Sequence, residues 1–128
     1  MSSRYYAKAV DFVKLGRLNV ALHCLDRALD LNPRDAEVWL YKGVLLGKLG
    51  KHEEELKCYD KAVEIDPNNP KAWYNRGAVL GNFGRYREAL PNFEEAQRKG
   101  HPRAAAAIED CQNELKKFRR SKETASNF

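Results

Sequence analysis

Few side chains in this sequence are placed to do chemistry. The three histidines, His23, His52 and His101, are far apart, and no acid or nucleophile recurs beside them. General acid–base and nucleophilic catalysis both need such groups to converge. The sequence also lacks a P-loop, a dinucleotide-binding glycine motif and a nucleophile elbow. We therefore predict that the protein is not an enzyme and needs no cofactor.

The three cysteines do not form a metal-binding or disulfide pattern. Cys24, Cys58 and Cys111 include no CxxC pair, and an odd, low count argues against a disulfide framework. Cys24 and Cys58 are 34 residues apart, which is also the spacing of a repeat described below. We predict free thiols, no bound metal, and a reducing, non-secreted, cytoplasmic location.

The composition excludes several classes of protein. Of the 128 residues, 43% are hydrophobic and 32% are charged, and the longest run without a charged residue has eight residues. A membrane-spanning helix needs roughly 20 apolar residues, so none is predicted. The net charge of +5 comes largely from residues 116–122, which hold five basic residues and no acid. The rest of the chain is near neutral, unlike a uniformly basic nucleic-acid-binding domain.

The chain repeats itself with a period of 34 residues. Gly16, Gly50 and Gly84 share this spacing. Other positions with the same period hold small or large apolar residues, namely Ala28, Ala62 and Ala96, then Leu25, Tyr59 and Phe93, then Phe12, Leu46 and Leu80. Small and large positions that stay in phase over about 100 residues indicate stacked copies of one structural unit.

Each repeat is predicted to form two helices. In the second repeat Trp39, Gly43 and Leu46 lie at i, i+4 and i+7, on one face of a helix. Gly50 ends that helix, because glycine adopts the left-handed conformation without a side-chain clash. The prolines and asparagines of residues 66–70 end the next helix. The predicted helices span 3–15, 18–31, 36–49, 52–65, 70–83 and 86–99, and no strand is predicted.

These repeats resemble the tetratricopeptide repeat (TPR), whose signature places Trp, Leu, Gly and Tyr in one helix and Ala, Phe, Ala and Pro in and after the next. The second repeat carries Trp39, Gly43, Leu46, Tyr59, Ala62 and Pro67. The third carries Trp73, Gly77, Leu80, Tyr86, Ala89, Phe93 and Ala96. The resemblance covers residues 2–101 in three repeats, about 2–35, 36–69 and 70–101. It implies an all-α fold in which the hairpins stack as a right-handed superhelical solenoid.

Residues 102–119 are predicted to form a capping helix after the third repeat. Ile108, Cys111, Leu115 and Phe118 lie at i, i+3, i+7 and i+10, so this helix has one apolar face. Such a helix covers the apolar face that the last repeat of a solenoid leaves open. Its outer face is expected to carry Glu109, Asp110, Gln112, Asn113 and Lys116. Residues 120–128 are expected to form a basic, frayed tail.

Two residues depart from the repeat pattern. Glu55 occupies the position that Ala21 and Ala89 fill in the other repeats, so we expect the second helix pair to be looser there. Pro91 lies inside the predicted helix 86–99. An internal proline removes one backbone hydrogen bond, so that helix is expected either to kink or to start later than its counterparts.

The resemblance also indicates a binding surface, because the first helices of stacked TPR units line a concave groove. The residues that it places there as binding candidates are Tyr6, Val10, Leu40, Tyr41, Val44, Lys71, Tyr74, Asn75, Ala78 and Asn82. Tyrosine suits such a surface, because it offers a large contact area with a polar tip. The alternative for each residue is that it packs against the neighbouring repeat.

One activity of the TPR family can be compared residue by residue. Co-chaperone TPR domains hold the acidic C-terminal tails of chaperones with a carboxylate clamp of Lys, Asn and Arg. The corresponding positions here hold Tyr6, Val10, Tyr41, Lys71 and Asn75, and only Lys71 matches. Without the other donors an acidic tail would lose its charge-assisted hydrogen bonds. Chaperone tails are therefore not expected as partners.

The first functional hypothesis is a protein–protein interaction adaptor or scaffold that binds a peptide or helix of another protein in the groove. A second hypothesis is a nucleic-acid-associated module that uses the basic residues 116–122. The alternatives for this basic segment are that it is only solvated or that it is a localisation signal. A third is self-association into a homodimer through Tyr5, Tyr6 and Val10, which have no cap before them. No membrane partner is expected.

Overall fold

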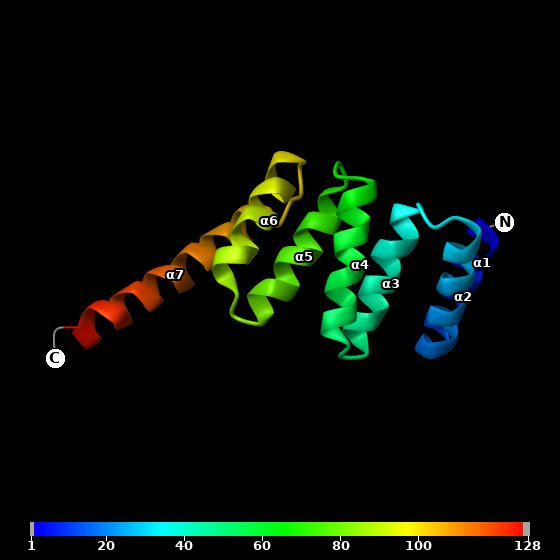
Figure 1. The fold of residues 1–128 in the computed structure, drawn as a ribbon, viewed down its shortest axis with the longest axis horizontal. Coiled ribbons are helices and arrows are strands. Elements are labelled where there is room, and N and C mark those ends of the chain that lie inside the picture. Colours follow the sequence, from blue (N-terminus) through cyan, green and yellow to red (C-terminus); the bar gives the residue numbers. More distant parts are fainter. Residues whose placement is uncertain (1, 127–128) are drawn as a thin grey trace. The chain divides into compact units, whose positions relative to one another are not determined.

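Seven α-helices make up the part of the chain that the structure describes. The computed structural model describes residues 2–126, and this part of the chain contains no strand (Figure 1). The helices are α1 (Ser2–Lys14), α2 (Leu18–Leu31), α3 (Ala36–Lys48), α4 (His52–Ile65), α5 (Pro70–Asn82), α6 (Tyr86–Arg98) and α7 (Ala104–Ser126). The first six begin and end within one residue of the predicted spans. The predicted all-α fold class is confirmed.

The chain divides into two compact units at the bond between Pro67 and Asn68. The N-terminal unit holds the hairpins α1–α2 and α3–α4, with α2 packed on α3. Its core consists of small and aliphatic side chains, namely Ala9, Ala21, Cys24, Leu25, Ala28, Leu29, Val38 and Leu45. The C-terminal unit holds the hairpin α5–α6 and the helix α7, which packs on α6.

The helix ends follow from local hydrogen bonding. Gly50 has a φ of 77°, so α3 ends there with the Gly50 N–H donating to the Gly47 carbonyl at 3.0 Å. At the helix starts, the side chain of Asp35 accepts from the Val38 N–H at 3.4 Å, and that of Asn69 accepts from the Lys71 N–H at 3.0 Å. These caps satisfy backbone donors that the first turn of a helix leaves unpaired.

Glycines allow the two helices of a hairpin to approach closely. A Cβ atom on Gly43 would lie 2.5 Å from Cε1 of Tyr59, and one on Gly77 would lie 2.9 Å from Cε1 of Phe93. Carbon atoms normally approach to about 3.5–4.0 Å, so an aromatic ring of the second helix occupies the place of the missing side chain. The large residue in each second helix therefore depends on a glycine in the first.

Glu55 is accommodated by a neighbouring glycine and not by looser packing. Its side chain is buried, and a Cβ on Gly47 would lie 2.3 Å from its Oε2 atom. The Tyr59 hydroxyl donates to Oε2 at 2.8 Å, and His52 Nδ1 lies 2.9 Å from Oε1. The expected loosening of α3 from α4 is thus replaced by a carboxylate that fills the space over Gly47 and is hydrogen-bonded there.

Pro91 lies inside α6, which begins at Tyr86. This is the repeat position at which α2 and α4 also begin, so the alternative of a later start is wrong. The proline ring is exposed, while Asn92 beside it is buried. The Asn92 amide donates to the Glu88 carbonyl at 2.8 Å and accepts from Arg76 at 3.3 Å. The bond from Arg76 ties α5 to α6, and the bond to Glu88 lies within α6, next to the turn that the proline weakens.

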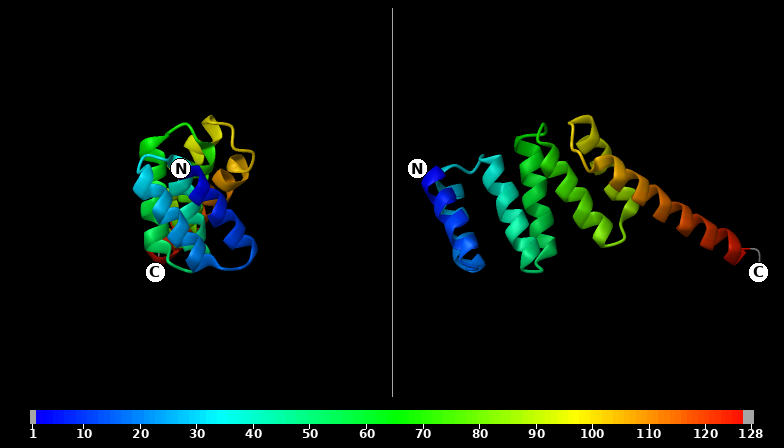
Figure 2. Two further views of the ribbon diagram at one scale, coloured as in Figure 1. Left: turned by 90° about the vertical axis from the view of Figure 1, so that its right-hand side faces the viewer. Right: turned by 180° about the vertical axis from the view of Figure 1, so that it is seen from behind.

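Helix α7 is longer than the expected capping helix. It continues to Ser126, whereas we expected it to end at residue 119 and a frayed tail to follow. No glycine or proline occurs after Pro102, so nothing in the local sequence stops the helix. Figures 1 and 2 show the last part of α7 extending past the α5–α6 hairpin. Within residues 2–126, none of the helices is both long and apolar enough to cross a membrane.

Candidate functional site

In the N-terminal unit, α1 and α3 bring two of the predicted tyrosines together. The ring centroids of Tyr6 and Tyr41 are 5.4 Å apart, with 44° between the ring planes. Burial raises the pKa of both phenols, and the nearby Glu37 carboxylate raises that of Tyr6 further. Both hydroxyls therefore stay protonated at neutral pH and can donate hydrogen bonds. Val10 and Val44 are half-buried on the same helices.

Leu40 is not part of an open surface. Only 6% of its side chain is exposed, so the expectation that it anchors a partner is wrong. The repeat places tyrosine at the equivalent positions 6 and 74, where the polar hydroxyl favours a partly solvated site, whereas leucine has no polar atom to keep it there. Tyr5, Tyr6 and Val10 are half-buried, so the start of the chain offers less apolar surface for self-association than expected.

The C-terminal unit holds a hollow of about 500 Å³ between α5 and α7. Three of the predicted residues line it, Tyr74, Ala78 and Asn82. Two others, Lys71 and Asn75, lie on α5 outside its lining; Lys71 is exposed and Asn75 is half-buried. We call this hollow the α5–α7 groove.

Helix α7 supplies half of the groove, which the sequence reasoning missed. Asp110 and Asn113 line it, although we expected them on the outer face of the capping helix. Glu114 and Lys117 line it as an ion pair with 3.1 Å between Oε1 and Nζ. The spacing of Asp110, Glu114 and Lys117 at i, i+4 and i+7 is the signal that could have placed them on one face.

The floor of the α5–α7 groove is aromatic. The Tyr74 ring contacts Phe93 with centroids 5.4 Å apart and stacks on His101 with centroids 4.0 Å apart and 5° between the planes. His101 Nδ1 accepts from the Arg103 N–H at 3.1 Å, so the ring proton of the neutral imidazole is on Nε2. Burial lowers the pKa of His101, and the positive charges of Arg103 and Lys71 lower it further.

We expect His101 to titrate below pH 6.5, the ordinary histidine value, in an NMR titration of its imidazole resonances. Replacing Tyr74 with Ala should raise the midpoint, because the imidazole would then be in water. As the pH falls, the His101 side chain is protonated in the unfolded chain before it is protonated in the folded chain. The contribution of His101 to the free energy of unfolding is therefore highest above pH 6.5 and decreases as the pH falls through the lowered pKa of folded His101. A midpoint in Tyr74→Ala equal to that of the wild type would contradict the role of the stack.

Burial suppresses the reactivity of two cysteine thiols. Burial raises the pKa of Cys58 to about 11 and also raises that of Cys111, so both thiols are protonated and poorly nucleophilic. In the part of the chain that the structure describes, no cluster of His, Cys, Asp or Glu could hold a metal ion.

Comparison with known sequences gives one family. A sequence model of the tetratricopeptide repeat matches residues 6–70, and a second model of the tetratricopeptide repeat matches residues 58–90. No curated protein matches the chain.

Solved structures share the fold. The Sgt2 TPR domain from Aspergillus fumigatus has a TM-score of 0.84 at 17% identity, covering 93% of this chain and 82% of that one. The Arabidopsis OM64 TPR domain has a TM-score of 0.81 at 24% identity, covering 88% and 94%. The first TPR of Spaghetti (RPAP3), bound to the HSP90 peptide SRMEEVD, has a TM-score of 0.82 at 18% identity, covering 89% and 94%. With half of its residues matched by a tetratricopeptide repeat model, this chain belongs to the tetratricopeptide repeat family.

Proposed function

We propose that this protein is a non-catalytic adaptor that binds a peptide or short helix of another protein on the faces of its first helices. TPR proteins of the same fold bind peptide partners, as the RPAP3 complex illustrates. The proposed contact residues are Tyr6, Val10, Tyr41 and Val44 in the N-terminal unit and Lys71, Tyr74, Asn75, Ala78 and Asn82 in the C-terminal unit. A reducing, cytoplasmic setting belongs to the same proposal, since all three cysteines are buried free thiols.

The α5–α7 groove is the observation that carries this proposal. Its aromatic floor gives apolar contact area, and the small side chain of Ala78 leaves room above it. Asn82 and Asn113 on the rim offer both donors and acceptors, which an extended peptide backbone requires. An apolar floor with a few polar groups that fix orientation is typical of peptide-binding grooves.

The charges of the groove favour a partner with a basic side chain. Asp110 lies on the rim, and the Glu114 carboxylate is already paired with Lys117. A lysine or arginine of the partner would pair with Asp110, whereas an acidic tail would be repelled. The carboxylate clamp retains only Lys71 here, so the HSP90 peptide bound by RPAP3 is not the kind of partner that we propose.

The test is affinity purification from the native cell lysate with the wild-type chain and the Tyr41→Asp, Tyr74→Asp double variant. A buried interface rarely tolerates an unpaired carboxylate, so we expect the double variant to lose the partners that the wild type captures. Leu15→Asp is the matched control, because it makes the same change at a side chain that is 69% exposed and outside the candidate surface.

Folding must be separated from binding, because Tyr41 and Tyr74 are half-buried. Circular dichroism should show equal helix content in all three proteins. A further variant, Asp110→Lys, changes only an exposed side chain and should weaken binding of a basic partner by about tenfold. If the double variant and Asp110→Lys both recover the wild-type set of partners, the proposal is wrong.

A further inference from the structure

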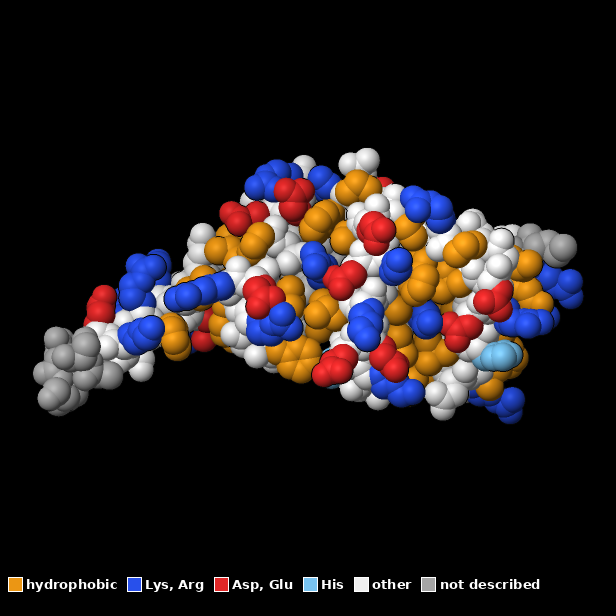
Figure 3. Space-filling view, in the orientation of Figure 1, with side chains coloured by type: hydrophobic (Ala, Val, Ile, Leu, Met, Phe, Trp, Pro, Cys, Tyr) orange, Lys and Arg blue, Asp and Glu red, His pale blue; other side chains and the backbone are white. Residues whose placement is uncertain are grey.

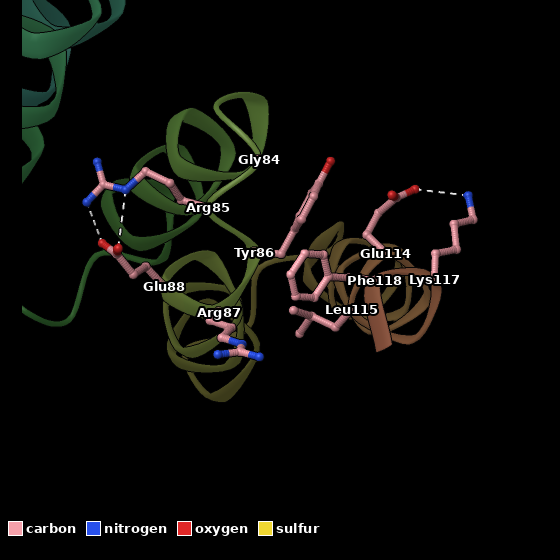
Figure 4. A pocket seen from close by; sticks show the side chains of 9 residues that line it. All are labelled: Gly84, Arg85, Tyr86, Arg87, Glu88, Glu114, Leu115, Lys117 and Phe118. Atoms are coloured by element: carbon pink, nitrogen blue, oxygen red, sulfur yellow. Dashed lines mark hydrogen bonds and ion pairs between the residues drawn. The ribbon is translucent and has the colours of Figure 1, made fainter. Parts of the chain in front are cut away.

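The C-terminal unit has a second hollow surface, between the start of α6 and the last turns of α7. Two adjoining hollows of about 580 and 490 Å³ share Arg87, Leu115 and Phe118 in their lining. Figure 4 shows Leu115 and Phe118 projecting from α7 toward Tyr86 at the start of α6. We call this the α6–α7 surface.

The floor of the α6–α7 surface is apolar and uncovered. Leu115 and Phe118 continue the stripe of α7 that begins with Ile108 and the buried Cys111. The apolar stripe is longer than the part of α6 that packs on it, because α6 begins at Tyr86 and the end of α7 extends past that residue (Figure 2). As a result 55% of the Phe118 side chain is exposed. An exposed apolar side chain in line with a buried stripe marks a place where a further helix could pack.

The rim of this surface is positively charged. Three acids also line it: Glu88 pairs with Arg85 at 2.5 Å, Glu114 pairs with Lys117 at 3.1 Å, and Glu123 lies beside Arg119 and Lys122 in the lining, so the cations outnumber the acids. Arg87, Arg119 and Lys122 line the surface as well, and Lys122 Nζ lies 5.7 Å above the Phe118 ring. Figure 3 shows Lys and Arg side chains along α7 with hydrophobic side chains between them.

We propose that the α6–α7 surface docks an acidic amphipathic helix of another protein. A helix lays its apolar side chains into such a floor, and its Asp and Glu residues would pair with Arg87, Arg119 and Lys122. At 1.5 Å per residue, Leu115 to Lys122 spans about 10 Å, which two turns of the partner helix match. This surface adjoins the α5–α7 groove, with which it shares Tyr86, Glu114 and Lys117, but its floor of Leu115 and Phe118 is its own and its partner carries the opposite charge.

Charge selects this occupant over a second copy of the chain. Pairing two α6–α7 surfaces would place Arg119 and Lys122 of one copy near the same cations of the other, and like charges at a desolvated contact are costly. The phosphates of a nucleic acid would pair with the cations, but they would make no favourable contact with the apolar side chains of Leu115 and Phe118.

The test is a selection that uses the full chain as the target. The displayed library consists of helical peptides with a fixed apolar stripe and randomised polar positions. We expect Asp and Glu to be enriched beside the stripe. The best peptide, measured by fluorescence anisotropy, should bind Phe118→Ser about tenfold more weakly or worse, and Arg119→Glu with Lys122→Glu likewise. Leu15→Asp is the control, because Leu15 is 69% exposed and lies outside this surface, and it should bind the peptide as the wild type does. Phe118 and Arg119 are exposed, so these variants keep the fold.

Any of five results would overturn the proposal. Two come from the library, if it yields no binder or yields binders without acidic enrichment. The third is that the selected peptide binds Phe118→Ser as tightly as the wild type. The fourth is that a single-stranded oligonucleotide binds the wild type and Phe118→Ser equally, with steep salt dependence, while no acidic helix competes, which assigns the cations to nucleic acid. The fifth is a dimer in sedimentation that Phe118→Ser dissociates, which assigns the surface to a second copy.

Discussion

Replacing Gly43 with Ala is expected to lower the free energy of unfolding by about 2 kcal/mol, even though alanine favours helices over glycine by about 1 kcal/mol. The new Cβ would lie 2.5 Å from Cε1 of Tyr59, at least about 1 Å closer than carbon atoms pack. Tyr59 cannot move away, because its side chain is 2% exposed and its hydroxyl is hydrogen-bonded to Glu55. Overpacking of this kind costs about 1–3 kcal/mol or more and outweighs the helix preference.

Gly81→Ala is the matched control, and it should have the opposite sign. Gly81 is also a glycine of a first helix, in the last turn of α5, but a Cβ there would be 4.0 Å from the Cβ of Ala89, an ordinary contact. With no clash, only the helix preference remains, so this variant should gain about 0.5–1 kcal/mol. Urea unfolding followed by circular dichroism measures both variants, with the slope expected to stay constant.

A double variant identifies the clash as the cause. In Tyr59→Leu the ring atoms that meet the new Cβ are gone, so adding Gly43→Ala to Tyr59→Leu should leave only the helix preference, a gain of about 0.5–1 kcal/mol. Since Gly43→Ala alone is expected to lose about 2 kcal/mol, the coupling energy between the two positions should be positive and about 3 kcal/mol. If Gly43→Ala is as stable as the wild type, or if its cost persists in Tyr59→Leu, the close approach of α3 and α4 at this point is not what the structure describes.

The helix boundaries could be predicted from sequence, because each is marked by a local signal. Gly50 and Gly84 end first helices with a positive φ, and Asp35 and Asn69 cap the helices that follow. Such signals act within four or five residues, so a single sequence contains them completely. The 34-residue period then fixed how many hairpins to expect, since the same signals recur in phase.

The candidate site was predicted less well, because it depends on which side chains meet across helices. The repeat pattern placed Leu40 on the open face, yet the structure buries it. It placed Asp110 and Asn113 on the outer face of the capping helix, yet both line the α5–α7 groove. The alanine run 104–107 at the start of α7 carries no information on which face turns inward.

Glu55 shows the same limit in another form. Its type departs from the repeat, and the sequence reasoning correctly marked it as unusual. The compensation lies eight residues earlier, at Gly47, and only the packing of α3 on α4 shows that the carboxylate occupies the space over this glycine. A sequence thus shows that a residue departs from the repeat, but it does not show which other residue accommodates the departure.

Pro91→Ala is expected to raise the free energy of unfolding by about 2 kcal/mol. Position 91 is the sixth residue of α6, beyond the first turn, so a residue with an N–H would donate to the Arg87 carbonyl, which proline cannot do. Proline in a helix interior costs about 3 kcal/mol, of which it returns about 0.4–1 kcal/mol by restricting the unfolded chain. The helix effect is the larger of the two. The ring is exposed, so no packing is lost, and the bond from Asn92 to the Glu88 carbonyl remains.

The reverse change at the equivalent position tests the same argument. Lys57 lies 34 residues before Pro91, is exposed, and is also the sixth residue of its helix, α4. Lys57→Pro should therefore lose about 2–3 kcal/mol while Pro91→Ala gains, both measured by urea unfolding with an unchanged slope. If Pro91→Ala is no more stable than the wild type, Pro91 does not destabilise the α6 turn at Arg87 by the usual amount. In that case the Asn92 bonds to Glu88 and Arg76, and not the backbone ladder, hold this turn, and Asn92→Ala should then be the more damaging change in α6.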